Sequence, residues 1–343
     1  MSGIEEVLKK MVIAPPSYEQ LFESAIRRAR KMRKSARGLA GIKGLEASRI
    51  EAARAYVTNY LRKLALRSPF LKEMHPFHRE LASLVLDADE YKRCLALIYG
   101  AARIIDKIAY EQKRKVKLAS DRREAARARR QFFARLRSVL EELDKCFSSL
   151  RKYQLELRKL PNVDPELETI IVAGPPNVGK SSLVRAVSRA KPEVREYPFT
   201  TKTIIVGHID LPDRRIQVID TPGLLDRPME FRNPIELQAV LAMKHLRGVI
   251  VFLFDPSETC GYPLEYQLRV YADIKRNFPN TPCIPVANKV DILDFHKAGE
   301  LVKKLSESDR KRLFFISALK KINVEDLVAE AISLLPPSGE AKI

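Results

Sequence analysis

The stretch ETIIVAGPPNVGKSSLVRAV, residues 168–187, decides the fold of this chain of 343 residues. An apolar run suited to a buried strand leads straight into a glycine-rich loop, which opens into a segment with helical spacing. Gly174, Gly179, Lys180 and Ser181 fill the pattern G-x-x-x-x-G-K-[ST] in the strand–loop–helix context that it requires. Its glycines let backbone N–H groups face phosphates, and the helix N-terminus adds a positive end. The stretch therefore predicts a phosphate-binding loop.

The predicted phosphate contacts cover nine consecutive residues. Lys180 is expected to bridge the β- and γ-phosphates and to act in catalysis, and the Ser181 hydroxyl is expected to ligate Mg²⁺. The full set is Gly174, Pro175, Pro176, Asn177, Val178, Gly179, Lys180, Ser181 and Ser182.

Guanine recognition is predicted by the segment NKVD at residues 288–291, which ends an apolar strand. The Asp291 carboxylate can accept from N1–H and the exocyclic amine of guanine, whereas adenine offers no such pair of donors. The wrong base would leave a buried charge unpaired. Ser317 and Ala318, which follow the next strand, are expected to support the guanine O6 through their backbone. The predicted guanine contacts are Asn288, Lys289, Asp291, Ser317, Ala318 and Leu319.

Two segments between these motifs are predicted to be switches, at 195–203 and 220–232. A mobile loop needs a hydroxyl that reaches Mg²⁺ when the γ-phosphate is present, and Thr201 is our choice, with Thr200 as the alternative. Asp220 is expected to hold Mg²⁺ through water, and the Gly223 N–H to sense the γ-phosphate. The second switch contains Asp220, Thr221, Pro222, Gly223 and Leu224.

Leu224 stands where a Ras-type enzyme carries the glutamine that orients the attacking water. Intrinsic hydrolysis is therefore expected to be slow. Asn177, three residues before Lys180, suggests a K⁺ ion beside the phosphates, which would offset charge in the transition state. The alternative is that Asn177 braces the loop through a backbone hydrogen bond. The predicted catalytic residues are Lys180, Thr201, Gly223 and Asn177.

The two halves of the chain differ in hydrophobic periodicity. Residues 1–160 carry long stretches of helical spacing, including one stripe over 136–157 that predicts a helix of about 35 residues, and they predict a bundle of four or five helices. From LPNVDP (160–165) onward, apolar strands alternate with helices, which predicts a mostly parallel α/β sheet with helices on both faces. The expected division is a helical bundle at 1–160, a GTPase domain at 161–337 and a short tail at 338–343.

The excess positive charge is confined to the helical half. Residues 1–160 hold 37 Lys and Arg against 19 Asp and Glu, whereas residues 161–343 hold 25 against 24. Such an imbalance favours a polyanion, and folded RNA above an anionic membrane, although a solvated basic surface is the plain alternative. The RNA-contact candidates are Arg27, Arg28, Arg30, Lys31, Lys113, Arg114, Lys115, Arg123, Arg127 and Arg130.

Several features narrow the class of protein. No apolar run is long enough to span a membrane, and the N-terminus shows no secretory signal. The four cysteines show no spacing typical of a metal or redox site, which predicts a reduced protein. We therefore expect a cytoplasmic location and no membrane partner, and a chain that is monomeric outside any larger assembly.

Longer segments resemble a known family. YPFTT after GPPNVGKSS is similar to the Obg-related branch of P-loop GTPases. The segments LPNVDP, TTKTIIVGHID, VIDTPGLLDRPMEFRNPIELQAV, HLRGVIVFLFDPSETCG and PVANKVD resemble the nucleolar GTP-binding protein (Nog) family over about 160–335. The end of the sequence near 343 is similar to a short archaeal-type form without the long C-terminal extension of eukaryotic members.

The resemblance implies a GTP-binding and GTP-hydrolysing factor that assists assembly of the large ribosomal subunit. It implies GTP or GDP with Mg²⁺ as ligands, and a large-subunit precursor, its rRNA and ribosomal proteins as partners. Two other functions remain open from the sequence. One is a nucleotide-gated RNA-binding scaffold in which hydrolysis is incidental, and the other is a regulatory GTPase associated with translation.

Overall fold

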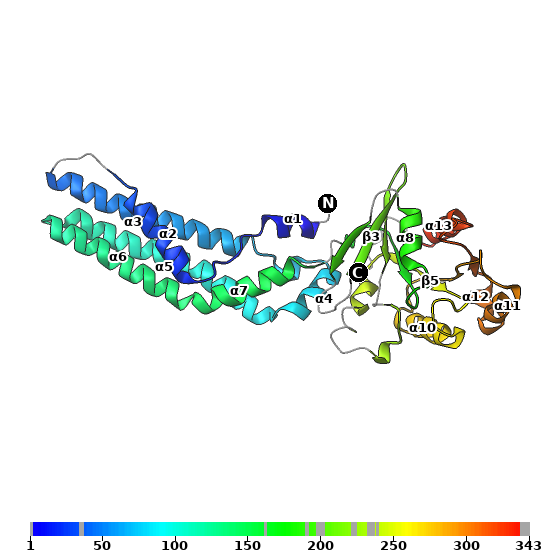
Figure 1. Cartoon of the computed structure of the whole chain (residues 1–343). Coiled ribbons are helices and arrows are strands. Elements are labelled where there is room, and N and C mark those ends of the chain that lie inside the picture. Colours follow the sequence, from blue (N-terminus) through cyan, green and yellow to red (C-terminus); the bar gives the residue numbers. More distant parts are fainter. Residues whose placement is uncertain are drawn as a thin grey trace. The chain divides into compact units, whose positions relative to one another are not determined.

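The computed structural model describes residues 3–33, 38–160, 163–188, 192–196, 203–220, 225–231, 237 and 240–336. The chain divides into two compact units (Figure 1). The helical unit consists of residues 6–73 and 86–158, and the sheet unit contains residues 1–5, 74–85 and the chain from 159 onward, so the division falls within the first helix. The single boundary expected at residue 160 stays a prediction, because residues 74–85 group with the later part of the chain.

Long helices that run side by side make up the helical unit (Figure 1). Helix α3 packs against α2 and α5, and α5 packs against α6. The facing sides bury aliphatic and aromatic side chains, among them Ile50, Leu61, Ile98 and Phe132, as the helical periodicity predicts. The helices are α1 (Gly3–Lys10), α2 (Tyr18–Arg30), α3 (Gly38–Leu66), the 3₁₀ turn η1 (Leu71–Glu73), α5 (Ala88–Leu118), α6 (Arg122–Glu142) and α7 (Asp144–Leu157).

Capping residues set helix starts that the apolar pattern did not resolve. The Asp87 carboxylate accepts from the backbone N–H groups of Asp89 and Glu90, so α5 begins there and is separate from the preceding helix α4 (Pro76–Val85). The Asp121 side chain accepts from the Glu124 N–H at the start of α6. The stripe at 136–157 is shared between α6 and α7, which meet at Leu143, so the single long helix expected there is wrong.

A disulfide joins Cys94 of α5 to Cys146 of α7, with the two Cα atoms 5.1 Å apart. This corrects the expectation of a reduced protein. The two cysteines are 52 residues apart in the sequence, and they meet because α5 and α7 pack against each other. Their spacing could not indicate that contact.

Among the described residues, the sheet unit has seven strands in the order β2-β3-β4-β1-β5-β6-β7. Strands β1, β4, β5, β6 and β7 are parallel, whereas β3 runs antiparallel to β4 and to β2. This confirms the α/β class expected from the alternation of strands and helices. The strands are β1 (Thr169–Ala173), β2 (Glu193–Glu196), β3 (Thr203–Asp210), β4 (Arg215–Asp220), β5 (Gly248–Phe254), β6 (Cys283–Ala287) and β7 (Phe314–Phe315).

Helices cover both faces of this sheet, so β1 and β5 are buried along their whole length. On β5, Val251 and Leu253 belong to a core shared with α8 and α13, while the rings of Phe252 and Phe254 contact Tyr271 of α10 in tilted and edge-on arrangements. The elements around the sheet are α8 (Lys180–Val187), η2 (Met229–Phe231), η3 (Ala242–His245), α10 (Leu264–Asn277), α11 (Phe295–Lys304), α12 (Glu307–Arg310) and α13 (Val324–Ser333).

Helix α4 (Pro76–Val85) belongs to the sheet unit although its sequence lies within the helical half. It packs against η3, where the Glu80 carboxylate lies 2.7 Å from Nε2 of His245 and 3.5 Å from Nζ of Lys244. His78 lies on the same helix and is buried, and this burial lowers the pKa of its imidazole to about 4. Helix α4 is therefore a structural part of the GTPase-like fold.

Candidate nucleotide-binding site

The glycine-rich loop between β1 and α8 uses backbone conformations that need glycine. The φ angle is +135° at Gly174 and +100° at Gly179. A Cβ atom on Gly174 would lie 2.5 Å from the carbonyl oxygen of Leu253, and one on Gly179 would lie 2.2 Å from Nδ2 of Asn288. Close packing on both sides therefore fixes the loop at the start of α8, where backbone N–H groups are free to face an anion.

Lys180 is buried inside this loop. Its Nζ donates hydrogen bonds to the carbonyl oxygens of Gly174 at 2.8 Å and Pro175 at 2.7 Å. Burial lowers the pKa of the ammonium group, while the carboxylates of Asp220 and Asp226 act in the opposite direction. Because it sits where a phosphate would enter, this ammonium can exchange carbonyl partners for phosphate oxygens.

Ser181 and Asp220 meet at the carboxyl edge of the sheet. Asp220 ends β4, whose register pairs it with Val172 of β1, and Ser181 lies in the first turn of α8. The Ser181 hydroxyl donates a hydrogen bond to the buried Asp220 carboxylate. A hydroxyl and a carboxylate side by side are the hard oxygen ligands that suit Mg²⁺, so two of the three residues predicted to hold the metal lie together, and the third, Thr201, is outside the described residues.

Asn288 connects the two halves of the predicted nucleotide site. Its buried side chain donates from Nδ2 to the carbonyl oxygen of Val178 at 2.7 Å, and its Oδ1 accepts from the Ala318 N–H at 2.9 Å. The first bond holds the phosphate-binding loop, and the second holds the segment predicted to support the guanine O6. Asn288 therefore fixes the distance between the two recognition elements, a role that its place in the motif did not reveal.

Lys289 pairs with a buried acid, Asp255, which is not among the predicted site residues. Its Nζ lies 2.7 Å from the Asp255 carboxylate and 2.9 Å from the Thr259 hydroxyl. Asp255 also accepts from the Ser257 N–H at 3.1 Å and the Cys260 N–H at 2.8 Å. Sequence analysis did not assign Asp255 to the site, because 34 residues separate it from Lys289.

The remaining predicted guanine contacts differ in exposure. The Asp291 side chain is exposed, and no hydrogen bond or ion pair joins it to another described residue. Ser317 is buried, and its backbone pairs in both directions with Ile322. Leu319 is 76% exposed beside buried Ala318, so it can cover one face of a base without filling the site.

Part of the predicted switch machinery lies outside the described residues. Thr200 and Thr201 are in this group, as are Thr221, Pro222, Gly223 and Leu224. Leu225, the next described residue, accepts a hydrogen bond from the Gly174 N–H at 3.0 Å. Leu225, within the predicted switch segment 220–232, is therefore hydrogen-bonded to the start of the phosphate-binding loop.

Asn177 protrudes from the phosphate-binding loop with φ at +62° and an exposed side chain. Among the described residues, none forms a hydrogen bond with that side chain, so the bracing alternative finds no partner there. Pro176 and Ser182 are half-buried, and Pro175 and Val178 are buried.

The RNA-contact candidates of the helical unit are exposed with one exception. Lys113 is half-buried and lies 2.8 Å from the Glu51 carboxylate, so it forms a bridge between α5 and α3. The row at i, i+4 and i+7 on α6, namely Arg123, Arg127 and Arg130, is exposed along its length. The other exposed candidates are Arg27, Arg28, Arg30, Lys31, Arg114 and Lys115.

Family models match parts of both units of the chain. A model of the NOG1 N-terminal helical domain matches residues 8–164, and a model of Nucleolar GTP-binding protein 1 (NOG1) matches residues 234–291. An uncharacterized protein of Methanocaldococcus jannaschii is 33% identical over 301 residues, which cover 86% of this chain and 83% of that protein. The chain belongs to the Nucleolar GTP-binding protein 1 family.

Curated eukaryotic members of the NOG1 family are longer. Nucleolar GTP-binding protein 1 of Drosophila melanogaster is 33% identical over 339 residues, which cover 95% of this chain and 51% of the relative. The protein of the same name in Saccharomyces cerevisiae is 35% identical over 240 residues, which cover 70% of this chain and 37% of that relative. The chain thus spans about half or less of the length of these relatives.

Solved structures are similar to about half of the chain. Nucleolar GTP-binding protein 1 of Plasmodium falciparum is 38% identical over 51% of this chain and 89% of that chain, with a TM-score of 0.44. The structure of Era in complex with MgGDPNP and part of 16S ribosomal RNA is 26% identical. The match covers 51% of this chain and 58% of that chain, with a TM-score of 0.36. Within the described residues, no helix is both long and apolar enough to cross a membrane.

Proposed function

We propose that this NOG1-family chain binds GTP and GDP with Mg²⁺ and hydrolyses GTP slowly. The observation that carries the proposal is a pair of hydrogen bonds at Asn288, which donates to the Val178 carbonyl oxygen and accepts from the Ala318 N–H, and so links a phosphate cradle to a guanine-recognition segment. Lys180 would bind the phosphates, and Ser181 with Asp220 would hold the metal ion. When bound, Mg²⁺ would neutralise charge that develops on the phosphate oxygens.

Competition binding with a fluorescent GDP tests the proposed nucleotide. GTP and GDP should displace it, whereas ATP should not, because Asp291 finds no paired donors on adenine. Asp291→Ala and Lys180→Ala should each abolish binding, and Glu300→Ala on exposed α11 is the matched control. Equal displacement by ATP, or wild-type affinity in either site variant, would contradict the assignment.

The proposed role of K⁺ rests on the exposed side chain of Asn177. A monovalent cation beside the phosphates would offset transition-state charge much as an arginine finger does. The turnover number should be higher in potassium than in sodium at matched ionic strength, and Asn177→Ala should remove the difference. The same rate in both salts would exclude this role.

We propose a precursor of the large ribosomal subunit and its rRNA as the partner, with ribosomal proteins as further contacts. Family membership and the exposed arginines of α6 support this, since such a row binds phosphates without regard to sequence. The GTP form would hold the particle, and the GDP form would release it. The cytoplasmic location and the monomeric state stay predictions.

Cosedimentation with large-subunit particles at moderate salt separates the candidate functions. Binding that is stronger with a non-hydrolysable GTP analogue than with GDP would support the assembly switch. Equal binding in both states would favour a constitutive RNA-binding scaffold. Replacing Arg123, Arg127 and Arg130 together by Gln should weaken binding in either case, and no binding in any state would contradict the ribosomal partner.

A further inference from the structure

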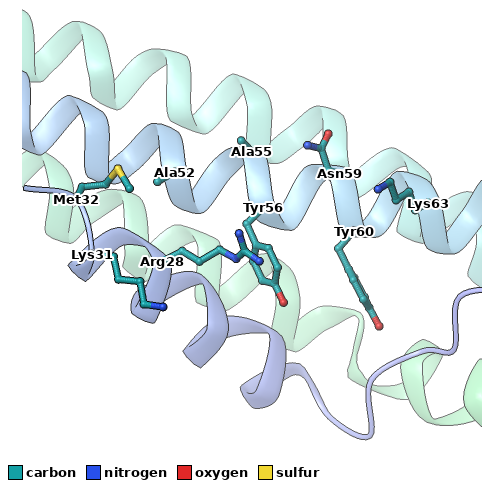
Figure 2. Close-up of a pocket in the computed structure, with 9 residues that line it drawn as sticks. All are labelled: Arg28, Lys31, Met32, Ala52, Ala55, Tyr56, Asn59, Tyr60 and Lys63. Carbon is teal, nitrogen blue, oxygen red and sulfur yellow. The ribbon is translucent and has the colours of Figure 1, made fainter.

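A groove of about 530 Å³ opens between α2 and α3 of the helical unit (Figure 2). Its volume lies within the range of sites that accept small organic groups. Three cations, two tyrosines and an asparagine contribute to the lining, and no acidic residue does. The described lining residues are Arg28, Lys31, Met32, Ala52, Ala55, Tyr56, Asn59, Tyr60 and Lys63.

A flat platform is already assembled in this groove. The Arg28 guanidinium lies over the Tyr56 ring, 4.4 Å from its centroid. Figure 2 shows the end of the Arg28 side chain against the Tyr56 ring, with the Tyr60 ring projecting from the next turn of α3. The Tyr60 hydroxyl donates to the carbonyl oxygen of Ile13 at 2.8 Å, which fixes that ring as a wall of the groove. Aromatic rings and guanidinium planes are the surfaces on which unpaired RNA bases stack.

The cations at the ends of the groove are not used by the fold. Lys31 and Lys63 are exposed and lie at opposite ends of the labelled set in Figure 2. The two acids of α3 are engaged elsewhere, since Glu46 pairs with Arg49 at 3.3 Å and Glu51 pairs with Lys113 at 2.8 Å.

No carboxylate among the described residues pairs with Arg28, Lys31 or Lys63. On the side of α3 that faces α5, by contrast, an arginine is paired with acids. There Arg54 forms ion pairs with Glu51 and, at 2.6 Å, with Asp106. The charge of the groove is therefore left for an anionic ligand.

We propose that this groove binds one unpaired nucleotide of a folded RNA. The base stacks on the Tyr56–Arg28 platform, and Lys31 and Lys63 bind the phosphates on either side of it. The Asn59 amide, at the rim, offers a donor and an acceptor to the base edge. An acidic peptide would satisfy the lysines but would leave the ring platform unused. The site deepens the proposed rRNA binding, on which it rests, because it adds recognition of an unpaired base to general attraction for phosphate.

The test uses the full chain and an RNA hairpin with a single bulged 2-aminopurine, whose fluorescence falls when the base stacks. The same hairpin without the bulge measures binding to paired RNA. Tyr56→Leu should abolish the fluorescence change and weaken binding to the bulged hairpin by about five-fold to a hundred-fold. Its binding to the paired hairpin should be close to wild type.

Matched variants separate the groove from the rest of the basic surface. In Lys63→Gln, the affinity for the bulged hairpin should depend less steeply on salt concentration than in wild type. The change in slope should correspond to the loss of about one phosphate contact. Tyr110→Leu changes a tyrosine of α5 that is 72% exposed, and Lys152→Gln changes an exposed lysine of α7. Neither control should affect the fluorescence, and both Lys63→Gln and Lys152→Gln leave the core intact.

Three outcomes would overturn the proposal. If Tyr56→Leu and wild type give the same fluorescence change and affinity, the groove is not the site, while RNA binding by the unit stands. If the wild-type chain binds neither hairpin, the proposed RNA function fails together with the site. If polyglutamate or free AMP binding depends on Tyr56 while RNA binding does not, the groove takes a different ligand.

Discussion

The Lys289 ammonium lies 2.7 Å from the carboxylate of Asp255, a side chain with no exposed surface at the end of β5. This ion pair fixes the lysine of the guanine-recognition segment to the loop that follows a neighbouring strand. Lys289 has φ at +66°, so its backbone adopts a left-handed conformation that the surroundings must hold in place. Asp255 therefore acts as a positioning residue for the predicted guanine site.

Asp255→Asn should lower both stability and guanine-nucleotide affinity. Removing the buried carboxylate leaves the charge of half-buried Lys289 without its partner, which should cost less than the roughly 3 to 5 kcal/mol of a fully buried pair. Thermal unfolding measures the first effect, and fluorescent GDP titration measures the second. Asp213→Asn, at a position that is 76% exposed beside Arg214, is the matched control. Wild-type affinity in Asp255→Asn would mean that Lys289 needs no such support.

Gly179→Ala should disrupt the connection between the phosphate and guanine segments. The new Cβ would lie 2.2 Å from Nδ2 of Asn288, and φ at +100° disfavours any L side chain. Backbone strain alone costs about 1 to 2 kcal/mol, so GDP affinity should fall about five-fold to thirty-fold if the bound loop carries that strain. Gly299→Ala, in open space on α11, should instead be neutral or stabilising. Equal GDP affinity in both variants would contradict the role of Asn288.

Sequence alone predicted the parts of this fold whose signals are local. The phosphate-binding loop needs glycines at fixed positions, and buried parallel strands read as continuous apolar runs, so β1 and β5 were correctly placed. Strand β2 was missed, because the residues EVRE at 193–196 carry no apolar run. It pairs only along one side, with β3, at the edge of the sheet as described.

Features that depend on distant pairing could not be predicted. Asp255 and Lys289 meet only because β5 and β6 are neighbours in the sheet. Helix α4 has ordinary helical spacing, so its sequence gave no sign that it packs with η3 in the sheet unit. The groove beside Tyr56 likewise needs α2 and α3 together, although Arg28 and Lys31 were recognised as basic residues.

The buried histidine of α4 should make the sheet unit acid-sensitive. Burial lowers the pKa of His78 to about 4 from an ordinary 6.5, and the charge of nearby His75 acts in the same direction. The folded state therefore favours the neutral ring, and stability should be lost as the pH falls from about 6.5 towards 4. The full loss is about 3 kcal/mol.

Unfolding midpoints in denaturant, measured between pH 7 and pH 4, test this expectation. His78→Phe should flatten the dependence, because it fills the same space without a titrating group. His296→Phe is the control, since His296 is exposed on α11. A steep dependence that survives in His78→Phe would assign the acid sensitivity to other groups.

The disulfide between α5 and α7 should stabilise the helical unit under oxidising conditions. It closes a loop of 52 residues, and loop-closure entropy for that length corresponds to about 4 kcal/mol. The Cys94→Ser variant and the reduced wild-type chain should therefore unfold at the same lower temperature. Cys260→Ser is the control, because Cys260 is a free buried thiol of the sheet unit. If a reductant leaves the melting temperature of the wild-type chain unchanged, the two thiols pack together without a stabilising bond.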